Sequence, residues 1–147
     1  PSNKLTICSI FAMFIRTMEP FEIAPTSRTP HVVFHRGNGN MSITGCSIPE
    51  NADKFYAPIH DVIEKYISAP AAKTTMRVEL SYFNSSSAKF LLEIMKKFDD
   101  LHDSRLSEVL LEWCYIKGDL DQQEAGEDFK ELLDFRTELI ELPDPDE

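Results

Sequence analysis

Motifs for nucleotide binding and for common catalytic chemistries are missing from this chain of 147 residues. Neither GxGxxG nor GxxxxGKS/T occurs, so nothing predicts a cradle for nucleotide phosphates. The patterns GxSxG, HExxH and CxxC are also absent, which removes the usual signatures of serine hydrolases, zinc proteases and redox dithiols. We therefore expect a protein that is not an enzyme and that needs no cofactor.

Cysteine is scarce, with only Cys8, Cys46 and Cys114 in the chain. An odd number without paired spacing does not build a disulfide framework. We expect reduced thiols, used as small apolar side chains in a cytoplasmic protein. His31 and His35 lie four residues apart, but no cysteine or glutamate stands beside them at ligand spacing, so we predict no metal site.

Basic residues are fewer than acidic ones. The chain has 15 lysines and arginines and 25 aspartates and glutamates, which gives a formal charge of −10. Such a surface repels phosphate backbones and anionic lipids. We therefore expect neither nucleic acid nor a membrane among the partners, and consider a protein with a basic patch the better candidate. The hydrophobic fraction of 42% is that of a globular chain, and the length fits one domain.

Apolar runs long enough to span a bilayer are absent as well. The run LTICSIFAMFI at residues 5–15 is shorter than the roughly 20 residues that a membrane helix needs. Lys4 precedes this run and Arg16 follows it, without a small-residue cleavage site. We predict that a single domain occupies residues 18–147, with an acidic tail from about residue 143, and that residues 1–17 are an upstream or mobile extension. The alternative is that residues 1–17 pack on the domain as an extra strand or helix.

Hydrophobic periodicity predicts an α/β fold. After an irregular, proline-containing segment at 18–30, we expect a β-hairpin around the turn at 38–40, followed by alternating helices and strands. The elements are predicted, in order, at strands 31–37 and 41–47, helix 51–68, strand 74–83, helix 88–101, strand 107–116, helix 120–133 and strand 137–142. This β-β-α-β-α-β-α-β order predicts a mixed, at least partly parallel sheet with helices packed on it.

Two details of this pattern bear on the surface of the domain. Along the strand at 74–83, alternation predicts that Tyr82 shares a buried face with Met76, Val78 and Leu80. Paired carboxylates, such as Asp99 with its neighbour at 100 and Glu127 with its neighbour at 128, fall on the predicted helices. Because such carboxylates are mostly exposed, we interpret them as solvated surface rather than as acid–base pairs.

The segment Phe83-Asn84-Ser85-Ser86-Ser87 lies between a predicted buried strand and a helix. Sites in α/β proteins are often found where a strand ends and a helix begins. The first helical turn carries about half a unit of positive charge and can accommodate a phosphate there. Phosphorylation would add about −1.5 to −2 charges and would oppose docking of a partner that offers no arginines. The simpler interpretation is that Asn84 or Ser85 only caps the helix.

Four segments resemble the SiaC family of biofilm regulators, a family that looks like a relative of the STAS-type anti-sigma-factor antagonists. They are SIPEN at 47–51, FYAPI at 55–59, ELSYFNSSSAKFLLEIM at 79–95 and EAGEDFKELL at 124–133. The similarity extends from about Glu19 to Leu142. It implies a STAS-like mixed sheet and a phosphorylation-controlled partner-switching role in the cytoplasm of a bacterium.

The resemblance also implies the partners and the switch residue. A cognate Ser/Thr protein kinase would phosphorylate one hydroxyl, a PP2C-type phosphatase would remove the phosphate, and the unmodified protein would bind and activate a diguanylate cyclase in cyclic di-GMP and biofilm signalling. Alignment at Asn84 places the phosphothreonine of the family on Ser85, with Ser86 and Ser87 matching the serines that follow. Here the acceptor is a serine, and Ser86 is the alternative acceptor. These four residues are the implied partner-binding site.

Two other functions stay open at this point. One is a small enzyme with Ser85 as its nucleophile, for which His60 or His102 would have to act as the base. The other is a structural interaction subunit without phosphorylation control, in which Asn84 and Ser85 serve only as helix caps.

Overall fold

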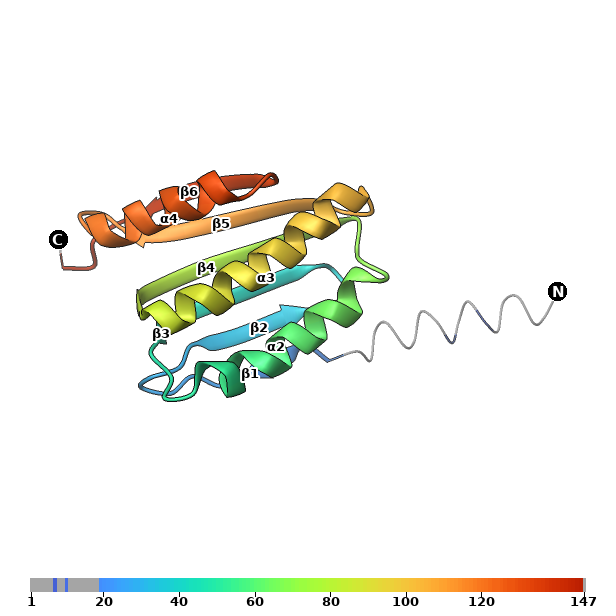
Figure 1. Ribbon diagram of the computed structural model, residues 1–147, viewed down its shortest axis with the longest axis horizontal. Coiled ribbons are helices and arrows are strands. Elements are labelled where there is room, and N and C mark those ends of the chain that lie inside the picture. Colours follow the sequence, from blue (N-terminus) through green and yellow to red (C-terminus); the bar gives the residue numbers. More distant parts are fainter. Residues whose placement is uncertain (1–6, 8–9, 11–18, 147) are drawn as a thin grey trace.

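Figure 1 shows the computed structural model of the chain, which describes residues 7, 10 and 19–146. Within these residues, six strands form one sheet whose spatial order follows the chain, from β1 to β6. The elements are β1 (Phe21–Ile23), β2 (His31–His35), β3 (Asn40–Ser47), α2 (Ala52–Ile67), β4 (Lys73–Phe83), α3 (Ser85–Ser104), β5 (Glu108–Ile116), α4 (Leu120–Leu132) and β6 (Arg136–Leu142). The predicted α/β order is confirmed, with one strand added in front.

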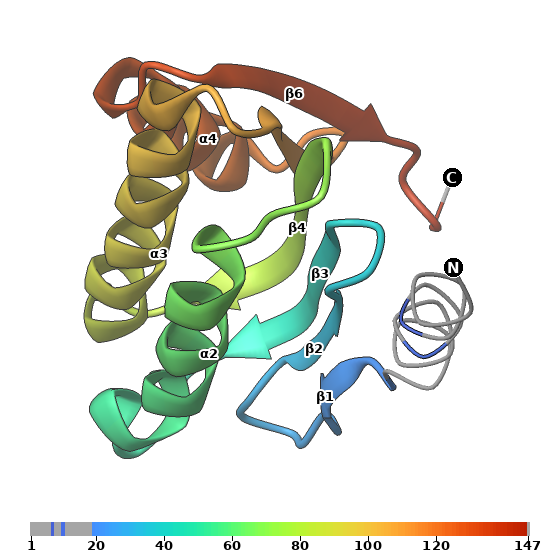
Figure 2. The ribbon, with the colours of Figure 1, turned by 90° about the vertical axis from the view of Figure 1, so that its right-hand side faces the viewer.

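The sheet is mixed, as predicted. β1 pairs with β2 and β2 with β3 in antiparallel fashion, whereas β3, β4, β5 and β6 run parallel to one another. One helix crosses over between each neighbouring pair of parallel strands. Since all these crossovers step across the sheet in the same direction and share one handedness, the three helices lie on the same face, as Figure 2 shows.

The prediction of an irregular segment at 18–30 is wrong at β1. Phe21 pairs with Phe34 on β2, and both Phe21 and Ile23 pack partly buried against the core. The prolines at 20 and 25 limit this strand to three residues but do not prevent it, because an edge strand needs ladder hydrogen bonds on one side only.

The core lies between the sheet and its three helices. α2 begins after the cap Asn51, as predicted, and α3 turns a row of aliphatic and aromatic side chains toward the strands. The largest completely buried side chains include Phe34, Tyr56, Phe98 and Trp113. Completely burying a side chain of this size contributes about 1.5–3 kcal/mol, so this layer carries most of the stability of the domain.

A β-bulge near the end of β4 reverses the orientation of Tyr82. Gly45 pairs with Leu80 and the next residue of β3 pairs with Tyr82, so Ser81 is skipped in the ladder. Leu80 is therefore buried while Tyr82 is 58% exposed, and Phe83 turns toward the core. The prediction that Tyr82 shares the buried face is wrong, because one extra residue in a strand exchanges its two faces from that point onward.

Gly126 allows α4 to lie close to the sheet. A Cβ at this position would approach the Trp113 Nε1 atom to 2.8 Å and the Leu139 Cδ2 atom to 2.7 Å. The Trp113 indole also donates a hydrogen bond of 2.8 Å to the Gln122 carbonyl in the first turn of α4. The absence of a side chain at Gly126 thus permits the close approach of α4 to Trp113 and Leu139.

We predict that Gly126→Ala destabilises the protein by about 1–2 kcal/mol. An alanine is ordinarily better than glycine inside a helix by about 1 kcal/mol, but overpacking against a buried ring costs more, about 1–3 kcal/mol. Urea unfolding measures the change. Glu127→Ala, at the exposed neighbouring position, is the control and should stay within about 0.5 kcal/mol of the unaltered protein. A stabilised Gly126→Ala variant would contradict the close packing.

Residues 1–17 lie outside the described residues, apart from Ile7 and Ile10. The division of the chain at residue 18 therefore stays a prediction. No helix of the described residues is long and apolar enough to cross a membrane.

Candidate functional site

The serine segment lies at the edge of the sheet where the parallel strands end. Figure 1 shows the amino ends of α3 and α4 at the same end of the molecule as the carboxyl ends of β4 and β5. Asn84 is the N-cap of α3, and its Oδ1 atom accepts a hydrogen bond of 2.9 Å from the Ser87 amide. The Asn84 amide donates to the Ser47 carbonyl over 3.1 Å. The segment is therefore attached to the end of β3 as well as to its own helix.

The three consecutive serines have different surroundings. Ser87 is completely buried, and its hydroxyl donates to the Ser47 carbonyl over 3.0 Å. Ser86 is exposed, and its hydroxyl donates to Asn84 Oδ1 over 3.0 Å. Ser85 is exposed and is the first residue of α3, and its side chain makes no hydrogen bond with any residue that the structure describes. Of the three hydroxyls, only that of Ser85 is both accessible and unengaged.

A chain of buried hydroxyl groups lies beneath this turn. The Ser47 and Ser87 Oγ atoms are 2.8 Å apart, and the Tyr56 phenol lies 2.6 Å from Ser47 Oγ. Because the Ser87 proton points to the Ser47 carbonyl, Ser47 Oγ must donate to Ser87 Oγ and accept from Tyr56. The chain of donors thus runs from Tyr56 through Ser47 to Ser87, and it joins α2, β3 and α3.

Burial raises the pKa of Tyr56 above its ordinary value near 10, although the nearby hydroxyl groups of Ser47 and Ser87 partly oppose this shift. Tyr56 as a whole is only 1% exposed, and its ring stacks on that of Phe90, with the ring centroids 5.7 Å apart. Tyr56 is therefore held neutral and remains a hydrogen-bond donor over the physiological pH range.

We predict that Tyr56→Phe lowers the free energy of unfolding by about 1–3 kcal/mol, since Ser47 Oγ then loses its donor inside the protein. Amide hydrogen exchange at Ser87 should become faster in the variant. Tyr82→Phe, which removes an exposed phenol, is the matched control and should change neither quantity. Equal stability of the two variants would contradict the proposed donor chain.

The raised pKa adds a dependence on pH. The unfolded chain loses the Tyr56 proton first as the pH rises, so the stability tied to the neutral phenol is complete below about pH 10 and declines above it. The unaltered protein should therefore lose more stability between about pH 9 and pH 11 than Tyr56→Phe does, in denaturation measured at each pH.

Comparison with known proteins places this arrangement in a family. The chain matches the description of SiaC family regulatory phosphoproteins over residues 23–142. It belongs to the SiaC family. An uncharacterised protein of Pseudomonas aeruginosa (strain UCBPP-PA14) is 26% identical over 118 residues, which cover 80% of this chain and 93% of that protein.

Solved SiaC structures share the fold of this chain. SiaC of Pseudomonas aeruginosa is 25% identical, with a TM-score of 0.78, and the match covers 85% of this chain and all of that one. Its apo form, also 25% identical, gives a TM-score of 0.76 over 84% of this chain and 99% of that one. SiaC bound as activator to the diguanylate cyclase SiaD gives a TM-score of 0.78 at 24% identity, over 83% of this chain and 99% of that one.

Among the described residues of this SiaC-family protein, neither candidate histidine is hydrogen-bonded to Ser85. His60 lies on α2 beside a cavity of about 190 Å³ between α2 and α3, and it forms no hydrogen bond with Ser85. His102 lies in the last turn of α3, about 25 Å along the helix from its first residue, at about 1.5 Å per residue. The geometry therefore does not support the hypothesis that Ser85 is a nucleophile.

The other candidate ligands do not assemble into a site. His31 contacts Glu22 over 2.8 Å, in a pair between β1 and β2. Across residues 7, 10 and 19–146, no three side chains of the metal-binding types are grouped closely enough to hold a metal ion. Cys46 and Cys114 carry free thiols, half-buried and buried respectively, and Cys8 lies outside the described residues.

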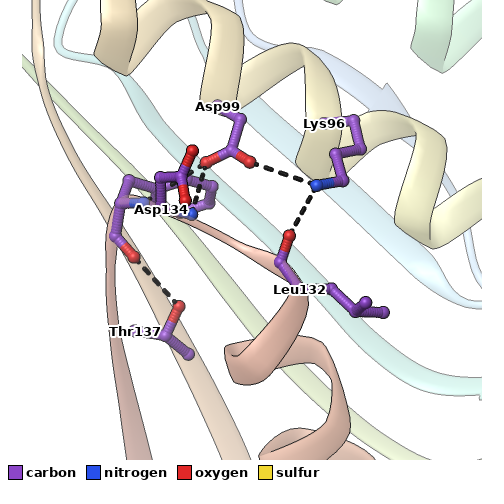
Figure 3. Close-up of polar contacts among 6 residues, drawn as sticks. Lys96, Asp99, Leu132, Asp134 and Thr137 are labelled. Carbon is purple, nitrogen blue, oxygen red and sulfur yellow. Dashed lines mark hydrogen bonds and ion pairs between the residues drawn. The ribbon is translucent and has the colours of Figure 1, made fainter.

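Asp99 is not the solvated carboxylate that its helix position predicts. It is 5% exposed, and its Oδ1 atom accepts hydrogen bonds from the amides of Asp134 and Phe135, at 2.9 and 3.2 Å (Figure 3). Lys96 bridges Asp99 Oδ2 and the Leu132 carbonyl at the end of α4. The carboxylate thus anchors the connection between α4 and β6 to α3, and its role is structural. Glu127 and its neighbour are exposed, as predicted.

Sequence reasoning identified the serine segment but missed the residues that support it. Ser47 and Tyr56 lie in two of the motifs that carry the family resemblance, yet their contact joins residues on different elements and leaves no local pattern. Ser47 ends a strand of alternating buried residues, and this was the one available signal of its burial. Sequence reasoning included Ser87 in the implied partner-binding site, whereas the structure buries its side chain beneath the turn.

Proposed function

We propose that this SiaC-family protein is a phosphorylation-controlled binding protein of a partner-switching system, and that its unmodified form binds and activates a diguanylate cyclase. The related SiaC of Pseudomonas aeruginosa is described as the activator of the diguanylate cyclase SiaD in their complex. The observation that carries the proposal is the free, exposed hydroxyl of Ser85 at the first residue of α3.

Ser85 is the proposed phosphate acceptor. A kinase must bring the hydroxyl in line with the γ-phosphate of its nucleotide, which requires an accessible side chain. Ser87 is completely buried and would have to leave its contacts with Ser47. Ser86 remains the alternative acceptor, but its hydroxyl would have to be released from Asn84 Oδ1.

The proposed switch acts through charge and hydration. A phosphate on Ser85 adds about −1.5 to −2 charges and three acceptor oxygens, and the positive end of α3 stabilises it on the free protein. A partner that covers Ser85 would have to strip water from this dianion. The chain itself already carries a net charge of −10, so further negative charge finds little compensation on this surface.

The proposed partner site has an accessible part and a buried part. Asn84, Ser85 and Ser86 form the part that a partner can touch, whereas Ser87 holds the turn from beneath. In the proposed cycle, a cognate Ser/Thr kinase adds the phosphate and a PP2C-type phosphatase removes it. Both reactions, and binding of the cyclase, are proposed to take place in the cytoplasm, with cyclic di-GMP production and biofilm formation as the outcome.

We predict that Ser85→Ala keeps binding to the cyclase and accepts no phosphate, while Ser85→Asp weakens that binding at least about tenfold, as an interfacial charge without a partner would. Co-purification with the diguanylate cyclase of the same cell, and its rate of cyclic di-GMP synthesis, measure both effects.

Ser86→Ala is the matched control for that experiment, since it removes the neighbouring exposed hydroxyl. It should keep both phosphorylation and binding. Phosphate that persists on Ser85→Ala and disappears from Ser86→Ala would move the acceptor to Ser86. Equal binding by the Ala and Asp variants at position 85, with no phosphate under any growth condition, would favour a purely structural interaction subunit instead.

A further inference from the structure

We infer that the partner docks on Tyr82 and Leu120, two exposed apolar side chains at the edge that carries Ser85, and that its contacting segment presents an apolar side chain with a lysine or arginine beside it. Tyr82, Leu120 and the groove beside them are called the edge patch. The inference rests on the proposed function in one respect, since it takes the partner to be the protein that Ser85 controls.

Tyr82 is turned outward by a specific feature of the backbone. Without the bulge at Ser81, continued alternation would bury Tyr82 on the side of Leu80. The Ser81 hydroxyl donates to the Gly45 carbonyl over 3.1 Å, which ties the bulged residue to β3. β-Bulges near functional sites commonly redirect a side chain, and tyrosine is one of the residues that contribute most to binding at protein interfaces.

Among the large apolar side chains that the structure describes, Leu120 is the most exposed, at 72%, although it begins a well-anchored helix. The Asp119 side chain caps α4 by accepting from the Gln122 amide over 3.2 Å. The buried Trp113 ring holds the Gln122 carbonyl in the same turn. Leu120 is thus presented on a fixed backbone, so little conformational freedom would be lost on binding.

A shallow groove of about 320 Å³ lies between Tyr82 and the first turn of α4, the turn that also carries Leu120. Its lining residues are Ser81, Tyr82, Phe83, Asp119, Asp121, Gln122 and Ala125. The two aspartates lie on either side of Leu120 in the chain, and the exposed Asp121 has no ion pair with any described residue. Two apolar side chains bordered by carboxylates that form no ion pair with a described residue are complementary to an apolar side chain accompanied by a basic one.

The position of the edge patch also accounts for the direction of the proposed switch. Ser85 follows Tyr82 by three residues and lies at the same end of the sheet (Figure 1). A dianion at this end of the sheet must lose water when the partner covers it. Since the partner's basic side chain pairs with the carboxylates of the groove, it is not available to compensate the phosphate, and phosphorylation would release the partner from the edge patch.

Leu106 provides a matched control because it is also a largely exposed leucine but lies elsewhere. It is 59% exposed and precedes β5, at the opposite end of the sheet beside His102 and Arg105. Exposed leucines alone thus do not define the edge patch. Leu120 differs from Leu106 because it lies at the end of the sheet that carries Tyr82 and Ser85, in the helix turn that lines the acidic groove.

The test measures binding of the purified full-length diguanylate cyclase of the same cell by Tyr82→Ala, Leu120→Ala and Leu106→Ala, each with position 85 unmodified. We expect Kd to rise at least about tenfold for the first two variants and less than about twofold for Leu106→Ala. Asp121→Lys should weaken binding and reduce its dependence on salt. The three alanine substitutions replace exposed side chains, so circular dichroism and Tm should be unchanged, whereas Asp121→Lys should keep the circular dichroism spectrum and lower Tm slightly, because it places a positive charge in the first turn of α4.

The possible outcomes separate the edge patch from the phosphorylation switch. Unchanged affinity of Tyr82→Ala and Leu120→Ala, together with loss of binding by Ser85→Asp, would overturn the edge patch and leave the switch intact. Loss of binding by Tyr82→Ala and Leu120→Ala, with normal binding by Ser85→Asp, would support the edge patch and remove the switch. An equal loss in Leu106→Ala would overturn the edge patch, and a cyclase that binds none of the proteins would overturn both proposals.

Discussion

The hydroxyl and carbonyl groups of Ser47 hold together the part of the molecule on which function is proposed to depend. Through them, the end of β3 contacts Tyr56 on α2 and both Asn84 and Ser87 at the start of α3. These contacts are buried, so each broken bond would leave a polar group without water. The turn between β4 and α3 is consequently fixed on two sides, and Ser85 is left as the serine of the cluster that faces solvent and forms no hydrogen bond with the described part of the chain.

The same edge of the sheet combines rigid support with an exposed surface. The bulge at Ser81 redirects Tyr82, and the close packing of Gly126 on Trp113 positions the first turn of α4 with Leu120. At the far end of α3, Asp99 anchors the connection that leads into β6. A surface on fixed backbone suits a regulator whose partner must distinguish two forms that differ by a single phosphate.

Much of the fold could be predicted from the sequence because its signals are local. The cap Asn51, the hairpin turn at 38–40 and the apolar stripe of α2 each depend on residues a few positions apart. The serine segment was found for the same reason, since it stands at a boundary between alternating and helical spacing. β1 was missed because three residues between prolines are too few to show alternation.

What the sequence could not reveal are contacts between elements and departures from regular spacing. Tyr82 was placed on the wrong face because the single skipped residue at 81 changes no composition and breaks no motif. Asp99 was assigned to the surface because its donors lie 35 and 36 residues further along the chain. Ser47 and Tyr56 likewise meet only once α2 has folded back onto β3.

The most direct test of the central claim uses protein in which phosphoserine is installed at position 85 during synthesis, compared with the unmodified protein. Isothermal titration calorimetry with the diguanylate cyclase gives one dissociation constant for each form. The account predicts tight binding by the unmodified form and at least about tenfold weaker binding by the phosphorylated form. Equal dissociation constants for the two forms would contradict it.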